Sequence, residues 1–188
     1  MPLPADLLRP ADGRWLFFDL ETLRGADEVG GWDRIRDMGL ALAVTLDATT
    51  GLFTTWFERD VDALAELLLA ADRVVGFNLD RFDLTVLEAY TGPRIRQVRS
   101  LDLLTLIHQR LGFRVSLGHL AQETLGAPKL ADGLQSLAWV REGRLDLVEP
   151  YCRADVRLTA ALWAHGRARG HVLFRNREGL RGKVPVGW

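Results

Sequence analysis

The sequence has little cysteine and no long hydrophobic run. Cys152 is the single cysteine, which excludes an intramolecular disulfide and any zinc site built from several cysteines. No apolar run approaches the roughly 20 residues that a membrane helix needs. The first residues, "MPLPADLLRPADGR", lack the basic stretch and the following apolar stretch of a secretory signal. We therefore expect a cytoplasmic protein without a membrane partner.

Other missing patterns exclude whole classes of site. No Gly-x-Gly-x-x-Gly turn follows a predicted strand, which counts against a dinucleotide-binding oxidoreductase. The Gly-rich stretch "RGADEVGGW" lacks the Gly-Lys-Ser/Thr of a phosphate loop. The histidines show no paired metal-ligand spacing, so we expect them at the surface or hydrogen-bonded in the core: His108, His119, His165 and His171.

What is present is the composition of a globular domain. The chain has 188 residues, of which 48% are hydrophobic and 26% are charged, enough to bury a sizeable core. The formal net charge of −1 argues neither for nor against a polyanionic partner, because the distribution of charge matters more than its sum. We expect one domain over residues 1–188, with a core at about 14–165 and a basic extension at 166–188.

Apolar periodicity and turn signals predict an α/β domain. Strands are expected at 14–20, 38–47, 52–58 and 73–77, with the middle two as a hairpin and a loop at 21–37. Helices are expected from Asp80 to Gly92, from near Asp102 to Gly112, and at 61–72, 116–126, 133–143 and 145–170. The alternating tail predicts a terminal hairpin that turns at Gly179 and Gly182.

Two acidic residues end the first predicted strand. Asp19 and Glu21 are two residues apart, so their side chains project from the same face of a strand. Acids that follow such an apolar stretch are costly to bury unless they are paired or bind a metal. The alternative is that the strand has already ended and both acids are solvated in a loop.

A second group follows the strand at 73–77. In "GFNLDRFDLTVL" Asn78 comes directly after the strand, and Phe82 and Asp83 lie in the next helix. Asp83 could instead interact with the dipole of that helix, and Asp80 suits this capping role at least as well.

A third group lies in "YCRADV" near the C-terminus. Tyr151 and Asp155 are four residues apart and share one face of a helix. Because Pro150 favours a helix start, we expect Tyr151 in the first turn with a mobile ring. The alternative is a packed tyrosine and an aspartate paired with Arg153 or Arg157.

The order of these three groups resembles the three motifs of the DEDD exonuclease superfamily. The groups are Asp-x-Glu, then Asn-x-x-x-Phe-Asp, then Tyr-x-x-x-Asp. The match is to its tyrosine branch and is similar to the proofreading exonuclease domain of family B DNA polymerases. The histidine branch would place His at position 150, where this chain has Pro150. The resemblance covers about residues 14–165 and implies a ribonuclease H-like fold, a mixed five-stranded sheet flanked by helices.

The resemblance also implies a role for each matched residue. Two Mg²⁺ or Mn²⁺ ions would be held by four carboxylates: Asp19, Glu21, Asp83 and Asp155. Asp19 would bridge the ions, and Tyr151 would orient the water that attacks the terminal phosphodiester. Leu20 and Thr22 would meet the terminal nucleotide through backbone and hydroxyl, and Asn78 would contact the strand. Thr22 could equally satisfy its own turn.

Several weaker signals keep two interpretations. Asp102 is either a second-layer residue or, with more support, a helix N-cap. Trp32 and Trp188 lie in polar, Gly-rich contexts where base stacking is possible but is not the default. Basic residues either contact a phosphate backbone or form a solvated rim: Arg94, Arg96, Arg99, Arg167, Arg169, Arg175, Arg177, Arg181 and Lys183.

The leading hypothesis is a small standalone, metal-dependent 3′–5′ exonuclease that acts on the 3′ ends of single-stranded DNA or RNA. An enzyme that trims oligoribonucleotides is the second reading, since no motif reports whether the pocket accepts a 2′-hydroxyl. A catalytically silent ribonuclease H-like module that binds nucleic acid is the third. We expect no proofreading in cis within this chain, and the sequence does not identify a repair or helicase partner.

Overall fold

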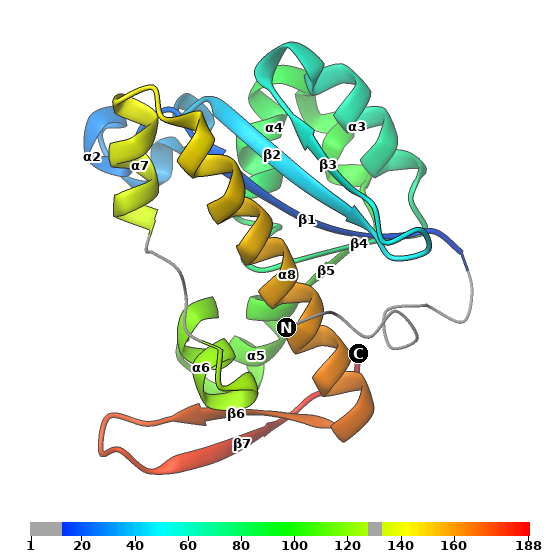
Figure 1. The fold of residues 1–188 in the computed structure, drawn as a ribbon, viewed down its shortest axis with the longest axis vertical. Coiled ribbons are helices and arrows are strands. Elements are labelled where there is room, and N and C mark those ends of the chain that lie inside the picture. The colour runs from blue at the N-terminus through cyan, green and yellow to red at the C-terminus, as the bar shows by residue number, and fades with distance from the viewer. Residues whose placement is uncertain (1–12, 128–132) are drawn as a thin grey trace.

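Five strands form one mixed sheet in the computed structural model, which describes residues 13–127 and 133–188. In spatial order they are β3 (Phe53–Trp56), β2 (Leu40–Asp47), β1 (Trp15–Thr22), β4 (Arg73–Gly76) and β5 (Ser100–Asp102). β1 pairs antiparallel with β2 and parallel with β4, so it is the central strand. The mixed five-stranded sheet with flanking helices confirms the expected fold class and is consistent with a ribonuclease H-like fold (Figure 1).

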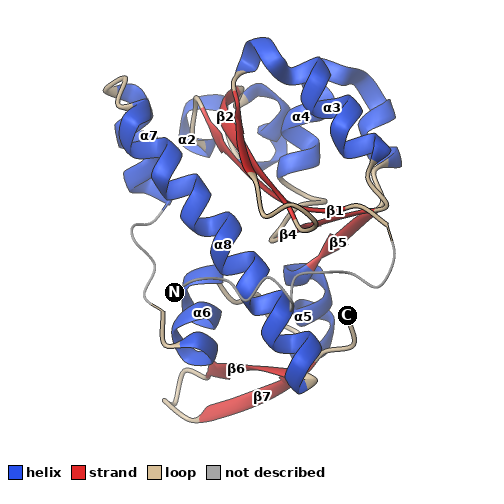
Figure 2. Ribbon diagram, turned by 45° about the vertical axis from the view of Figure 1, so that its right-hand side comes forward, coloured by secondary structure: helices blue, strands red, loops and turns tan. Residues whose placement is uncertain are grey.

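Helices lie on both faces of this sheet. The α-helices are α2 (Ala26–Val29), α3 (Val61–Ala70), α4 (Asp83–Thr91), α5 (Leu103–Leu111), α6 (Leu117–Leu125), α7 (Gly133–Arg141) and α8 (Leu145–Arg169). Short 3-10 helices are η1 (Trp32–Asp37), η2 (Glu58–Asp60) and η3 (Gly92–Gln97). In both ribbon views the long α8 crosses one face of the sheet, and α3 and α4 cover the other (Figures 1 and 2).

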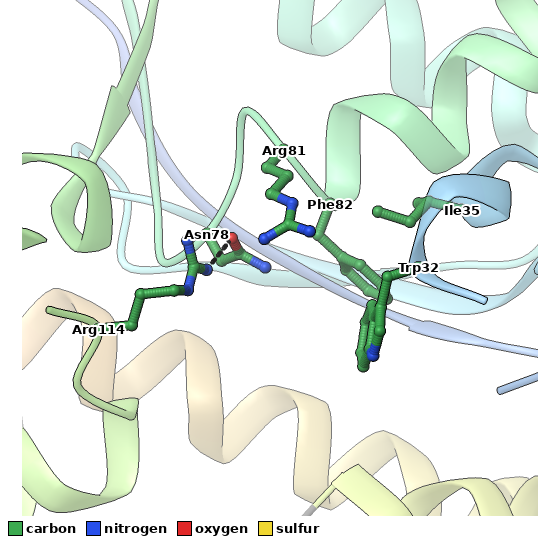
Figure 3. A pocket seen from close by; sticks show the side chains of 6 residues that line it. All are labelled: Trp32, Ile35, Asn78, Arg81, Phe82 and Arg114. Atoms are coloured by element: carbon green, nitrogen blue, oxygen red, sulfur yellow. Dashed lines mark hydrogen bonds between the residues drawn. The ribbon is translucent and has the colours of Figure 1, made fainter. Parts of the chain in front are cut away.

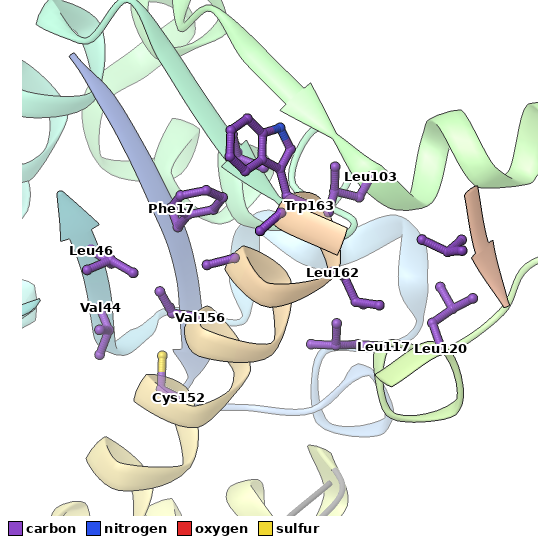
Figure 4. Packing of buried hydrophobic residues seen from close by; sticks show 14 of the residues in the cluster. Phe17, Val44, Leu46, Leu103, Leu117, Leu120, Cys152, Val156, Leu162 and Trp163 are labelled. Carbon is purple, nitrogen blue, oxygen red and sulfur yellow. The ribbon is translucent and has the colours of Figure 1, made fainter. Parts of the chain in front are cut away.

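The alternation of side chains along β1 divides the core in two. Leu16 and Phe18 belong to the cluster that includes the buried residues of α3 and α4. Phe17 points to the opposite face, where Trp163 of α8 packs against it with ring centroids 5.6 Å apart (Figure 4). Because neighbouring strand residues face opposite sides, Asp19 and Glu21 share the face of Phe17, which α8 covers.

Three local predictions are wrong. The expected loop at 21–37 contains α2 and η1, which are too short to show a hydrophobic period. The helix expected from Asp80 begins at Asp83. Tyr151 does not lie in a first turn, because α8 begins at Leu145 and carries Pro150 inside it.

The tail forms the expected C-terminal hairpin of β6 (His171–Arg175) and β7 (Arg181–Pro185). Gly179 lies in the turn with φ 80°, as predicted. Gly182 does not turn the chain but pairs with Phe174 within the hairpin. A side chain at this position would meet the Phe174 ring at 2.5 Å, so the glycine permits a close approach.

The described residues contain no helix that is both long enough and apolar enough to span a bilayer.

Candidate functional site

The first two acids lie on the central strand at the end that follows Phe17. Asp19 pairs with Val44 and Glu21 with Leu42 on β2, so both acids are strand residues and not loop residues. The ladder shifts register between Glu21 and Thr22, where β1 ends. Both carboxylates are half-buried beneath α8, where they are held close together.

Asp83 approaches the same strand from α4. It is the first residue of that helix and is 2% exposed. The backbone N–H of Leu20 donates a hydrogen bond of 3.1 Å to its carboxylate. Burial raises the pKa of Asp83 well above its usual value, and the negative charges of Asp102 and Glu21 add to this shift. The site therefore concentrates negative charge that a cation would stabilise.

The third group approaches from α8, opposite β1. Tyr151 and Asp155 are both buried, one turn apart on the same face of α8. The Tyr151 ring packs edge-on against Trp139 of α7, with centroids 6.2 Å apart. Burial raises the pKa of the Tyr151 hydroxyl far above its usual range, with further effects from Asp155 and Glu21. The hydroxyl therefore keeps its proton at neutral pH, and the ring is fixed.

Cys152 lies among these acids and was not predicted as a site residue. Its sulfur is 3.4 Å from the Asp19 carbonyl oxygen and 3.6 Å from an Asp19 carboxylate oxygen. Burial raises the pKa of this thiol well above its usual value, and the charges of all four candidate acids contribute: Asp19, Glu21, Asp155 and Asp83. The direct contacts of this thiol are with Asp19.

Three of the ligand atoms are close enough to hold a metal ion. One carboxylate oxygen each of Asp19 and Glu21 and the Cys152 sulfur lie within 4.8 Å of one another. Carboxylate oxygens suit hard cations such as Mg²⁺ and Mn²⁺. A thiol that keeps its proton is a poor ligand, because the thiolate is the form that binds metals. The donor set therefore fits a divalent cation held by oxygen.

Ser136 of α7 is a further contact that the sequence analysis missed. Its hydroxyl donates a hydrogen bond of 2.8 Å to Glu21, and its side chain is fully buried. Nothing in the local pattern of "GLQSLAWV" marks this serine, because the contact forms only when α7 packs beside β1.

The groups expected to meet the substrate already form hydrogen bonds within the protein. The Leu20 N–H is bonded to Asp83. The Thr22 hydroxyl donates to the Arg24 carbonyl at 3.0 Å, which is the turn-satisfying alternative. Asn78 has φ 69° and is the one non-glycine with positive φ in the described chain. Its side-chain oxygen accepts a hydrogen bond of 2.6 Å from Arg114.

Asp102 is the N-cap of α5, as expected, and accepts hydrogen bonds from Leu104 and Thr105. It also accepts from the backbone N–H groups of Asn78 and Asp80, at 2.9 and 3.2 Å. Asp80 does not cap α4, because that helix begins at Asp83 and its N-cap residue is Phe82. Instead, Asp102 fixes the turn that leads from β4 into the Asp83 segment.

The alternative for the third group was an ion pair of Asp155 with Arg153 or Arg157, but both arginines have other neighbours. Arg153 pairs with Glu149 at 2.8 Å, and the Arg157 guanidinium lies 5.0 Å from the Phe53 ring centroid. Many of the basic residues at the surface are paired as well. Glu123, for example, binds both Arg175 and Arg181 of the terminal hairpin at 3.0 Å.

The sequence matches no protein-family model and no curated protein. Among solved structures, the chain is similar to the family B DNA polymerase from the hyperthermophilic archaeon Pyrobaculum calidifontis, with a TM-score of 0.62 and 18% sequence identity. The match covers 81% of this chain and 24% of the polymerase chain. At this identity the similarity concerns the fold, and the chain shares the architecture of one part of that polymerase.

Proposed function

We propose that this protein is a metal-dependent 3′–5′ exonuclease of the DEDD tyrosine branch, acting on single-stranded nucleic acid. One observation carries the proposal. Three segments that are far apart in the sequence meet at β1. The Leu20 N–H binds Asp83 of α4, and the Cys152 sulfur of α8 lies 3.6 Å from an Asp19 carboxylate oxygen. Buried and half-buried acids that converge from separate segments are typical of a site that binds cations.

In this proposal four carboxylates hold two Mg²⁺ or Mn²⁺ ions: Asp19, Glu21, Asp83 and Asp155. When bound, such ions lower the pKa of a water and stabilise the charge on a leaving 3′ oxygen. The Leu20 N–H orients Asp83, and the Ser136 hydroxyl orients Glu21. Both contacts fix the direction in which a carboxylate presents its oxygens.

Tyr151 acts as a hydrogen-bonding group and not as a base. Its hydroxyl keeps its proton because burial raises its pKa, so it can orient a water but cannot abstract a proton from it. Burial and the edge-on contact with Trp139 hold the ring in place. Asp155 lies one turn further along α8, where its carboxylate can bind the same attacking water.

The test uses single-stranded DNA and RNA of one sequence, each labelled at the 5′ end, with Mg²⁺ or Mn²⁺. The expected result is a ladder that shortens from the 3′ end, requires the metal, and reveals which sugar is preferred. Asp19→Asn should abolish the ladder, because the amide keeps the shape of the side chain but loses its charge.

Asp62→Asn is the matched control. Asp62 lies on α3, its side chain is 86% exposed, and the substitution removes the same charge from the surface. It should leave the rate unchanged. Intact strands with both metals, or a ladder that persists in Asp19→Asn, would contradict the proposal.

A further inference from the structure

A pocket of about 220 Å³ opens beside the Asp83 segment and combines aromatic rings with positive charge (Figure 3). It is lined by Trp32, Ile35, Asn78, Arg81, Phe82 and Arg114. No acid lines it, although the whole chain has a formal charge of −1. Such a lining suits an anion that carries a flat ring, and each nucleotide of a single strand has both features.

Trp32 is the most unusual residue of this pocket, because its side chain is 61% exposed. Its indole rests on the Phe82 ring, with centroids 6.4 Å apart and planes inclined by 57°. Phe82 is half-buried and supports the indole from one side. The rest of the indole surface is open to a further ring.

This aromatic pair is held next to the candidate carboxylates. Phe82 directly precedes Asp83 in the chain. The segment that carries Trp32 leaves β1 after Thr22, and its two ends meet where the Leu23 N–H donates to the Gly39 carbonyl at 3.1 Å. Both aromatic residues are therefore tied to the segments that carry the acids.

Two guanidinium groups complete the pocket, and neither pairs with a carboxylate within residues 13–127 and 133–188. Arg81 is exposed, and Arg114 donates to the Asn78 amide oxygen. Figure 3 shows Arg114 reaching Asn78 from a different part of the chain than Arg81 and Phe82. Arg114 also lines a second hollow of about 760 Å³ that extends to Arg177 in the turn of the terminal hairpin.

We propose that Trp32 and Phe82 form an aromatic platform on which one base of a single strand stacks, while Arg81 and Arg114 hold the neighbouring phosphates. Arg114 then leads the strand toward the hollow beside the hairpin. This inference rests on the proposed function, because the stacked nucleotide belongs to the strand whose 3′ end meets the carboxylates.

The experiment measures binding of a labelled oligothymidylate by fluorescence anisotropy, with Mg²⁺ and in the Asp19→Asn background to prevent cleavage. Trp32→Ala should weaken binding roughly 5- to 100-fold, the range for loss of one stacked base. Trp32→Phe should keep most of the affinity but lose the quenching of tryptophan fluorescence by the oligonucleotide. Leu52→Ala, at an equally exposed apolar residue (67%) in the β2–β3 turn, is the matched control and should bind normally.

The dependence of binding affinity on salt concentration distinguishes base stacking from phosphate contacts. Arg114→Ala should reduce the slope of log affinity against log salt by about 0.7, the value for one phosphate contact on a single strand. Trp32→Ala should leave this slope unchanged, and Arg110→Ala on α5 serves as the arginine control. Strands with an abasic residue at successive positions from the 3′ end identify the stacked base, because at that position Trp32→Ala should no longer weaken binding.

Three results would overturn the platform: no binding of the single strand, equal affinity of Trp32→Ala, or quenching that persists in Trp32→Phe. The two proposals fail separately. Strand shortening by the wild-type protein together with normal binding by Trp32→Ala would remove the platform and keep the exonuclease. Binding that depends on Trp32, without any strand shortening by the wild-type protein, would keep the platform and remove the exonuclease.

Discussion

The Ser136 hydroxyl donates a 2.8 Å hydrogen bond to Glu21, which ties α7 to the end of β1 that carries the candidate acids. We expect Ser136→Ala to weaken Mn²⁺ binding by roughly 10-fold or more, the usual effect of losing a group that orients a metal ligand. A Mn²⁺ titration followed by thermal unfolding measures this change. Ser100→Ala on the edge strand β5 is the control, and an unchanged Mn²⁺ affinity in Ser136→Ala would show that Glu21 needs no such orientation.

This contact also marks the limit of what the sequence could predict. The central strands, the C-terminal hairpin and most helices follow from apolar periodicity and from cap residues such as Ser116 and Gly126, which begin and end α6 as expected. These signals are local, so one sequence is enough to find them. The short α2 and η1 carry no such period. The expectation from Pro150 that Tyr151 lies in a first turn is wrong, because α8 already begins at Leu145.

Some residues of the candidate site could likewise be identified from the sequence, and others could not. The acids and Tyr151 were named from the order of three short motifs. The contact of Asp83 with β1 and that of Cys152 with Asp19 bring the three segments together. Ser136 and Cys152 were not named, because each belongs to the site only through packing between distant segments. A lone serine and a lone cysteine on amphipathic helices carry no sequence signal of that contact.

Tyr151→Phe tests the role of the hydroxyl apart from that of the ring. The substitution keeps the ring contact with Trp139 and removes only the hydroxyl. We expect the rate of strand shortening to fall roughly 100-fold, while the free energy of unfolding falls by only about 1 kcal/mol. Mn²⁺ affinity should be unchanged. An equal loss of rate and of Mn²⁺ affinity would mean that the hydroxyl supports the metal site and not the attacking water.

Cys152 should be inert in the folded protein. It is fully buried, and burial beside four acids raises its pKa, so it has neither the access nor the thiolate form that reaction requires. We expect no labelling by a thiol reagent at neutral pH and complete labelling in denaturant. Rapid labelling of the folded protein would show that the α8 face opens, and it would make the thiolate a metal ligand to consider. Cys152→Ala should retain metal-dependent activity.

Glu123 anchors the terminal hairpin in a way that depends on pH. Hydrogen bonds from Arg175 and Arg181 lower the pKa of its carboxyl below the ordinary 4.5. The folded state therefore favours the ionised form more strongly than the unfolded chain does. The stabilisation is fully present above pH 4.5 and is lost as the pH falls through the lower folded value.

Glu123→Gln should consequently loosen β6 and β7 at neutral pH. Hydrogen exchange of the hairpin amides measures this local opening, and comparison of the two proteins at each pH removes the intrinsic pH dependence of exchange. We expect the wild-type hairpin to be better protected at neutral pH and the difference to shrink as the pH falls below 4.5. Glu66→Gln, which removes an exposed partner of Arg94, should leave the hairpin amides unchanged. If wild type and Glu123→Gln exchange equally at neutral pH, the hairpin is held by its apolar contacts, such as the ring contact of 5.9 Å between Phe174 and Phe113, and not by the ion pairs.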